Sequence, residues 1–187
     1  VNQLGQKQAL ECMAFAYEQG VNFFDNAEAY ASGDSEILMG KVLNKLNWTR
    51  DTYIVSSKVF WGGELPTQRG LSKKHIHDAC NAALKRLQVD YLDLFFCHRP
   101  DPDTPISETV YAMNDLIHQG KILYWGTSEW SAEEIKESFY EPVKMSIFSW
   151  DVLKKIQSNQ KGWESSLPDN VSDLIKEKKL FGIKELQ

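Results

Sequence analysis

From its start to Pro142, this 187-residue sequence alternates between short apolar runs and longer segments in which apolar residues recur at helical spacing. The alternation predicts strands that are each followed by a helix, and connections of that length favour a parallel sheet. No G-x-G-x-x-G motif follows any of the strands, so a dinucleotide-binding doubly wound sheet would lack its phosphate loop. The sequence therefore favours a (β/α) barrel, with strands predicted at 21–24, 52–57, 91–97 and 122–125.

Capping residues predict where the helices begin. Asp34, Ser72 and Thr104 each stand before a segment of helical periodicity, which is the position of an N-cap residue. Ser131 and Glu134 have the spacing of a capping box. The segment after Ser72 predicts the clearest helix, because its apolar residues form one continuous face.

The number of strands falls short of a closed barrel. A (β/α)8 barrel typically takes about 200 to 250 residues, whereas this sequence offers four strands and one candidate fifth at 145–150. Residues 154–170 are polar and weakly periodic, and residues 174–186 have room for at most one helix. The sequence therefore predicts a (β/α)8 TIM barrel that is incomplete in this chain.

This prediction also fixes the domain organisation. We expect one barrel domain over 1–187, with contiguous βα repeats over 1–142 and a remainder of uncertain structure over 143–187. We further expect that segments are missing at the start, between Pro142 and Lys154, and after Gln187.

Composition excludes some classes of function. The net charge of -5 and the lack of a basic run argue against a nucleic-acid-binding protein. No stretch reaches the roughly 18 consecutive apolar residues of a membrane span, and no secretory signal is visible, although a sequence that begins at Val1 leaves a leader open. Cys12, Cys80 and Cys97 lie in apolar periodic segments without a C-x-x-C pair. They predict buried free thiols in a reducing compartment, the cytoplasm.

Polar residues close each of the four predicted strands. They are Asp25, Lys58, His98 and Ser128, in chain order, and Tyr30 follows the first of them by five residues. In a parallel barrel the carboxyl ends of all strands meet at one rim, where catalytic residues lie. We therefore expect these side chains to converge.

Together, four of these residues can support carbonyl reduction. A carboxylate at Asp25 would pair with Lys58 and hold its ammonium in place. The ammonium would stabilise the phenolate form of Tyr30, which could then donate a proton to an oxygen that becomes negative. His98 could donate a hydrogen bond to the same oxygen.

The hydride for such a reduction has no source among the side chains. A nicotinamide cofactor must supply it, and Ser128 with Glu129 could bind its carboxamide. Trp61 and Trp130 follow two of the strand ends, where they could form a wall for a carbonyl substrate or simply plug the barrel end. Metal binding is disfavoured, because no His or Cys pair has ligand spacing.

Each residue also has a purely structural interpretation. Asp25 and Lys58 could form only an ion pair in the barrel mouth, Tyr30 could be a half-buried loop aromatic, and His98 a core histidine. The joint arrangement at successive strand ends favours the functional interpretation. Three further histidines receive no role, because two are expected on a helix surface and one near a helix end: His75, His77 and His118.

The motifs around these residues resemble a known family. The segments F-F-D-N-A-E-A-Y, I-V-S-S-K-V-F-W-G-G, D-L-F-F-C-H-R-P-D and Y-W-G-T-S-E-W are similar to the corresponding strands and loops of the aldo-keto reductases. Within the family, Y-W-G-T-S-E-W and R-P-D-P are most similar to the branch that includes the β subunits of voltage-gated potassium channels and their bacterial relatives. The resemblance runs from about Leu4 to Pro142.

The resemblance implies a barrel that binds NADP(H) and reduces aldehydes and ketones, with a catalytic tetrad at Asp25, Tyr30, Lys58 and His98. It also implies tetramers or octamers. Channel β subunits have asparagine in place of the histidine, so this chain is expected to be a working reductase. The alternative is a nicotinamide-binding regulatory subunit with little turnover.

Two further comparisons with the family pattern bear on the cofactor. The family uses asparagine or arginine where this chain has Glu129, whereas Ser128 matches the serine that binds the carboxamide. The later glutamine, the Ser-Pro-Leu turn and the basic residues that hold the 2′-phosphate have no match in this chain. The choice of NADP(H) therefore rests on the resemblance alone.

Overall fold

The computed structural model describes residues 5–140, 149–158, 160–164 and 171–178. The chain divides into two compact units, Val1–Ser138 and Phe139–Gln187. The expectation of one barrel domain over the whole chain stays a prediction.

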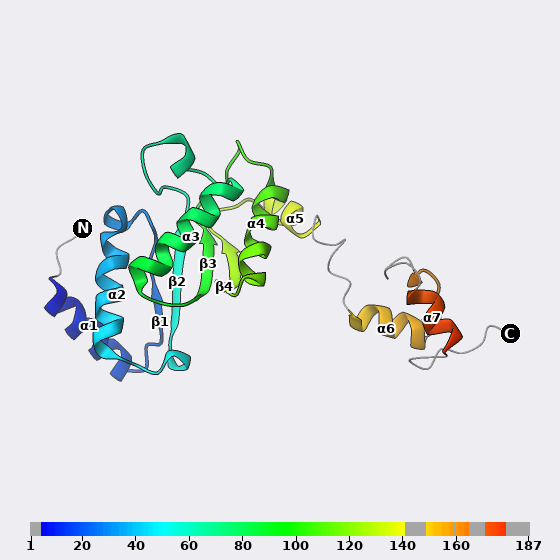
Figure 1. The fold of residues 1–187 in the computed structure, drawn as a ribbon, viewed down its shortest axis with the longest axis horizontal. Coiled ribbons are helices and arrows are strands. Elements are labelled where there is room, and N and C mark those ends of the chain that lie inside the picture. The colour runs from blue at the N-terminus through cyan, green and yellow to red at the C-terminus, as the bar shows by residue number, and fades with distance from the viewer. Residues whose placement is uncertain (1–4, 141–148, 159, 165–170, 179–187) are drawn as a thin grey trace. The chain divides into compact units, whose positions relative to one another are not determined.

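Helices and strands alternate along the first unit (Figure 1). In chain order the elements are α1 Gln6–Glu18, β1 Phe23–Asp25, η1 Tyr30–Gly33, α2 Asp34–Leu46, η2 Arg50–Thr52, β2 Ile54–Val59, η3 Pro66–Gln68, α3 Lys73–Leu87, β3 Leu92–Cys97, α4 Ile106–His118, β4 Ile122–Thr127 and α5 Ala132–Tyr140.

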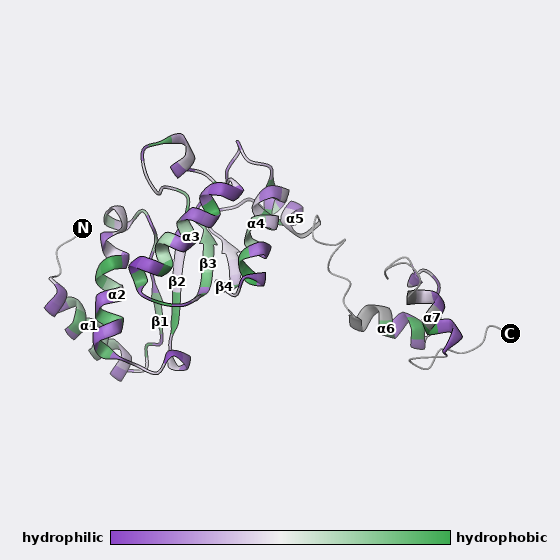
Figure 2. Cartoon of the chain, in the orientation of Figure 1, coloured by the Kyte–Doolittle hydropathy of each residue, from purple (hydrophilic) through white to green (hydrophobic). Residues whose placement is uncertain are grey.

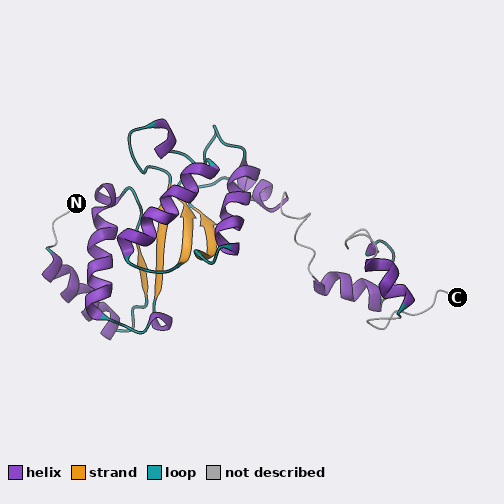
Figure 3. Cartoon of the chain, viewed as in Figure 1, coloured by secondary structure: helices purple, strands orange, loops and turns teal. Residues whose placement is uncertain are grey.

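The four strands form one parallel sheet in the order β1-β2-β3-β4, which confirms the strands and the pairing type predicted from the sequence (Figure 3). The register places Asp25 beside Ser56, and Lys58 beside Phe96. Strand bounds differ by up to two residues from the expected ones, most of all in β2, which is displaced by two residues at both ends. The sheet with its crossover helices is an α/β fold that corresponds to an incomplete (β/α)8 barrel.

Helix starts agree only in part with the expected caps. The Ser72 hydroxyl accepts the His75 N–H at 3.3 Å, and Ser131 and Glu134 form both hydrogen bonds of a capping box. Asp34 and Thr104, in contrast, are not N-caps. The N-cap residue of α2 is Gly33, with φ 92°, and that of α4 is Pro105, so each N-cap lies one residue from the expected one.

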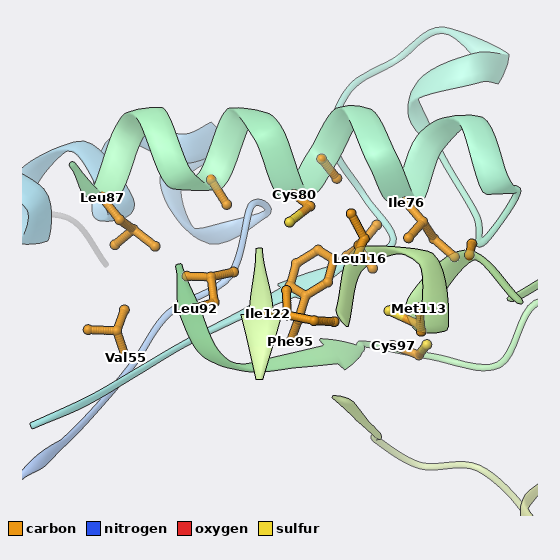
Figure 4. Close-up of a cluster of buried hydrophobic side chains, with 14 of the residues drawn as sticks. Val55, Ile76, Cys80, Leu87, Leu92, Phe95, Cys97, Met113, Leu116 and Ile122 are labelled. Carbon is orange, nitrogen blue, oxygen red and sulfur yellow. The ribbon is translucent and has the colours of Figure 1, made fainter. Parts of the chain in front are cut away.

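Helices α3 and α4 cover one face of the sheet, and the main core lies between (Figure 4). Phe95 is fully buried there, beside Cys80 of α3 and Leu116 of α4. Figure 2 shows the same division, with hydrophilic residues on the outer side of α3 and hydrophobic ones along β2 and β3. Apolar side chains that face one another across this layer supply most of the stability of such a unit.

The opposite face of the sheet carries apolar side chains that remain exposed. Phe23, Ile54 and Tyr124 retain 45%, 37% and 66% of their surface. Side chains alternate between faces along a strand, so Leu94, which lies one residue before the buried Phe95, points away from α3 as well. In a closed barrel this face is the interior.

The described residues of the second unit include two helices, α6 Ser149–Gln157 and α7 Val171–Glu177. A small core forms from Ile156, Trp163 and Ile175. The expected fifth strand at 145–150 lies largely outside the described residues, and its last two residues begin α6 instead. Helix α6 continues to Gln157, into the stretch that is polar and weakly periodic in sequence.

Two sequence expectations about single side chains were also wrong. Cys12 is exposed on α1, whereas Cys80 and Cys97 are buried as expected, and all three are free thiols. His75 is 4% exposed and so does not face a helix surface. Both errors arise because helical periodicity fixes which residues share a face but not which other elements cover that face. Over the part of the chain that is described, none of the helices combines the length and apolarity that crossing a membrane requires.

Candidate active site

Asp25 is the last residue of β1 and its side chain lies on the open face of the sheet. Ser56, its neighbour in register on β2, donates a hydrogen bond to one carboxylate oxygen. Lys58, two residues further along β2 and therefore on the same face, pairs with the other oxygen. Strand register thus places the carboxylate between two donors.

Lys58 uses all three donors of its ammonium. Besides Asp25, Nζ donates to the backbone carbonyl of Asn26 at 2.8 Å and to the Tyr30 hydroxyl oxygen at 3.2 Å. Its side chain is 13% exposed, so few water molecules can compete for these contacts. Because two donors are held by Asp25 and Asn26, the third is directed at the phenol oxygen.

Tyr30 begins η1 and lies between the lysine and His98. Its ring is 41% exposed and contacts the His98 ring edge to face, with centroids 5.9 Å apart. The sequence-predicted tetrad therefore does come together at one end of the sheet, from β1, β2, the loop after β1 and the end of β3. The Tyr30 side chain is thus partly exposed while its hydroxyl accepts a hydrogen bond from an ammonium.

His98 follows β3, and its backbone N–H donates to the Val59 carbonyl at 3.0 Å. The residue is 8% exposed, and its Nδ1 has no hydrogen-bond partner among the described residues. Burial lowers the pKa of His98, and the nearby positive charges of Lys58 and Arg99 lower it further, while Asp25 and Glu28 act in the opposite direction. The imidazole is therefore neutral at neutral pH and can donate one hydrogen bond without carrying charge.

The end of β4 adds Ser128 and Glu129. The Ser128 N–H donates to the Cys97 carbonyl at 3.0 Å, which holds the turn against β3. Ser128 is half-buried, and its hydroxyl forms no hydrogen bond with any described residue. Glu129 has a left-handed backbone with φ 60°, and its carboxylate pairs with Arg99 at 2.9 Å.

Arg99 is a residue that the sequence analysis did not single out. It donates to the His98 carbonyl at 2.5 Å, pairs with Glu129, and its guanidinium lies 5.5 Å from the centre of the Trp61 ring. Ser56 was missed as well, although it precedes Lys58 by two residues and a strand period of two places both on one face. No sequence pattern indicated Arg99, because its contacts depend on the conformation of the loop that carries it.

The two tryptophans lie in different surroundings. Trp61 is 38% exposed and packs edge to face against His98, with ring centroids 5.1 Å apart, at the mouth of the site. Trp130 is 8% exposed, belongs to the main core, and its indole Nε1 has no partner among the described residues. This arrangement favours the substrate-wall role for Trp61 and a packing role for Trp130.

Gly126 shapes the floor of the site. A Cβ at this position would lie 2.8 Å from the Phe96 ring, so only glycine lets that ring lie across β4. The two residues are paired in register and share the face that carries Lys58. The open face therefore carries an aromatic ring directly beside Lys58. Within the described ranges, no group of three His, Cys, Asp or Glu side chains could hold a metal ion.

Comparisons with known proteins agree with this geometry. The family model described as the aldo/keto reductase family matches residues 2–171. Two plant proteins named as probable voltage-gated potassium channel subunit beta, from Arabidopsis thaliana and from Oryza sativa subsp. japonica, are each 51% identical to the chain over 138 residues. That alignment covers 74% of this chain but 42% of each relative, so the chain spans less than half their length.

Solved structures give the same result. An aldo-keto reductase from Klebsiella pneumoniae in complex with NADPH is 33% identical with a TM-score of 0.61, over 71% of this chain and 43% of its own. A second structure from that organism, an aldo/keto reductase in complex with NADP and acetate, is 32% identical with a TM-score of 0.62, over 72% and 44%. By sequence and by fold, this chain belongs to the aldo/keto reductase family.

Proposed function

We propose that this chain carries the catalytic rim of an NADPH-dependent reductase that converts aldehydes or ketones to alcohols. The observation that supports this most directly is the 3.2 Å contact between Lys58 Nζ and the Tyr30 hydroxyl. In this proposal Tyr30 gives its proton to the carbonyl oxygen as negative charge develops there, and the ammonium stabilises the phenolate that remains. Asp25 keeps the lysine charged and in place.

His98 has an orienting role in this proposal. It lies beside the Tyr30 ring, and as a neutral imidazole it can donate a hydrogen bond to the carbonyl oxygen that receives the proton. A neutral donor orients the carbonyl without competing with Tyr30 for the proton transfer. The exposed Trp61 ring beside it provides an apolar surface for the substrate.

The residues present fit the nicotinamide end of NADP(H). Ser128 is half-buried and offers a hydroxyl without a hydrogen-bond partner in the described part of the chain, at the end of the sheet that also carries Lys58. This hydroxyl is suited to the carboxamide, whereas the Glu129 carboxylate is engaged by Arg99. When bound, the nicotinamide supplies the hydride that reaches the carbonyl carbon. The two Klebsiella pneumoniae structures, in complex with NADPH and with NADP, support this choice of cofactor.

The test measures loss of NADPH absorbance by the 187-residue chain with 4-nitrobenzaldehyde or methylglyoxal. Tyr30→Phe keeps the ring and removes the proton donor, so kcat should fall by about 10² to 10⁴-fold, the usual contribution of a general acid. Tyr111→Phe, at an exposed position on α4, is the matched control and should leave the rate unchanged. Equal rates for the wild type and Tyr30→Phe would reject Tyr30 as the acid.

A second candidate function is a nicotinamide-binding regulatory subunit with little turnover. The observation that favours it is the name of the two relatives at 51% identity, probable voltage-gated potassium channel subunit beta. Cofactor binding, followed by the fluorescence of NADPH, without turnover across a broad carbonyl panel would favour this second function. For either function we propose a reducing compartment such as the cytoplasm, because Cys80 and Cys97 are buried free thiols.

A further inference from the structure

A second pair of ionisable groups lies beneath the proposed active site. Glu28, in the loop after β1, contacts His75 of α3 through a 3.1 Å approach between Oε1 and Nε2, and both side chains are 4% exposed. A carboxylate oxygen only accepts hydrogen bonds, so this contact assigns a proton to Nε2 of the histidine. None of the proposed chemistry uses either residue.

The Glu28 carboxylate also bonds to the backbone of the loop that carries Trp61. The Phe60 N–H donates to Oε1 at 2.6 Å. On the other side of Trp61, a Cβ at Gly62 would lie 2.7 Å from Glu28 Oε2 and 2.8 Å from His75 Cε1. The backbone on both sides of Trp61 therefore rests directly on the buried pair.

The rest of this loop forms its own hydrogen bonds. The Gly62 N–H donates to the Gln68 carbonyl and the Gly70 N–H to the Phe60 carbonyl, both at 2.9 Å, and Trp61 forms an antiparallel bridge with Arg69. Segment 60–70 is thus internally bonded. The hydrogen bond from Phe60 to Glu28 attaches this segment beside the site.

We infer that Glu28 and His75 form a positioning device that fixes the Trp61 ring against His98. The device would act on substrate binding, because the ring 5.1 Å from the imidazole lines the place where a carbonyl would be oriented. Glu28 and His75 are positioning residues that act through Phe60 and Trp61. The effect on turnover rests on the proposed function, whereas the effect on the ring contact does not.

The first test observes the ring contact directly. In the wild-type chain, nuclear Overhauser effects should connect the indole protons of Trp61 with the ring protons of His98. Glu28→Ala should remove them, because it leaves the Phe60 N–H without its acceptor. Glu64→Ala is the matched control, since this glutamate lies in the same loop, is 93% exposed and pairs with Arg69 at the surface. Glu28→Gln keeps an acceptor for Phe60 and should retain the contact.

A second variant approaches the contact from the other side. Gly62→Ala leaves both members of the pair in place but puts a methyl group where the two side chains lie, which should lift the Trp61 backbone away. Because Gly62 is exposed in a loop, this variant should fold even if Glu28→Ala does not. An unchanged Trp61–His98 contact in folded Gly62→Ala would overturn the inference.

The functional readout separates KM from kcat. For Glu28→Ala and Gly62→Ala we expect a roughly two- to tenfold rise in KM for 4-nitrobenzaldehyde, the size expected for one misplaced aromatic contact, with little change in kcat or in NADPH affinity. A fall in kcat with unchanged KM would contradict the positioning role. A wild-type chain without turnover would reject the reductase proposal. If Glu28→Ala still removed the Trp61–His98 contact in that case, the positioning role would stand.

Discussion

Helices α3 and α4 cover one face of the sheet and leave the other face open. Alternate residues of the same strands lie on these two faces. On β3, Phe95 and Cys97 point to the helices and are fully buried, whereas Phe96 between them is only half-buried. On β2, the buried Ser57 hydroxyl donates to Glu36 of α2 at 2.6 Å, while Lys58 contributes its ammonium to the open face.

The difference shows how one set of strands serves two purposes. Parallel sheets are normally covered on both faces, which is why their strands are apolar throughout. On the covered face the apolar residues provide packing, and a buried polar pair such as Ser57 and Glu36 is hydrogen-bonded. On the open face the polar groups gather at the carboxyl ends of the strands, where the Asp25 side chain remains 40% exposed.

The largest expected difference between the faces is in stability. Phe95→Ala should lower the free energy of unfolding by about 3–5 kcal/mol, because it leaves a cavity among fully buried neighbours. Tyr124→Ala, on the open face, should change it by less than about 0.5 kcal/mol. Urea denaturation followed by circular dichroism compares the two. Similar losses for both variants would mean that the open face is covered.

Disrupting the ion pair on the covered face should likewise cost more stability than disrupting the ion pair on the open face. Glu36 is fully buried and accepts hydrogen bonds from Ser57 and from Arg86 Nε, the latter at 2.6 Å. The amide in Glu36→Gln has one acceptor oxygen, so we expect a loss of about 1–3 kcal/mol. Asp25→Asn should cost about 1 kcal/mol or less, because its side chain is 40% exposed. The same denaturation measurement tests both, and equal costs would contradict the comparison.

The open face should be sensitive to pH through His98. Its pKa is lowered by burial and by nearby positive charge, so the unfolded chain binds this proton at a higher pH than the folded chain. Stability should therefore fall as the pH drops through the ordinary histidine value, and this loss should stop growing below the folded-state pKa. His98→Asn should reduce the loss, as measured by urea denaturation across this pH range.

The charge contribution to that shift can be isolated. Lys58→Met should raise the pKa of His98, because it removes one of the positive charges that lower it. The titration is followed by NMR of the imidazole protons, with Lys74→Met on the exposed side of α3 as the control. A pKa of His98 that does not move in Lys58→Met would show that the Lys58 charge makes no contribution to the shift.

The smallest effect concerns thiol reactivity. Burial raises the pKa of the Cys80 thiol to about 12 and raises that of Cys97 as well, whereas Cys12 is exposed. An aromatic disulfide reagent should therefore label Cys12 quickly and the other two only after unfolding. The rapid phase should be absent from Cys12→Ser. Rapid labelling of Cys97 would show that the layer between sheet and helices opens readily.

Much of the fold could be predicted from the sequence, because its signals are local. Short apolar runs separated by amphipathic helices indicated four parallel strands, and the described part of the chain has four in that order. The polar residue at the end of each run indicated the candidate site, since parallel strands end at one edge. The tetrad contacts between Lys58, Asp25 and Tyr30 follow from register and loop length.

Only the tertiary structure decided what each residue meets. Glu28 and His75 are 47 residues apart, and nothing in either local pattern indicates their contact. The same holds for Arg99 with Glu129 and for the exposure of Cys12. Periodicity assigns a residue to one side of its own element, but burial and hydrogen bonding depend on which other element packs there, and that is determined by contacts between distant parts of the chain.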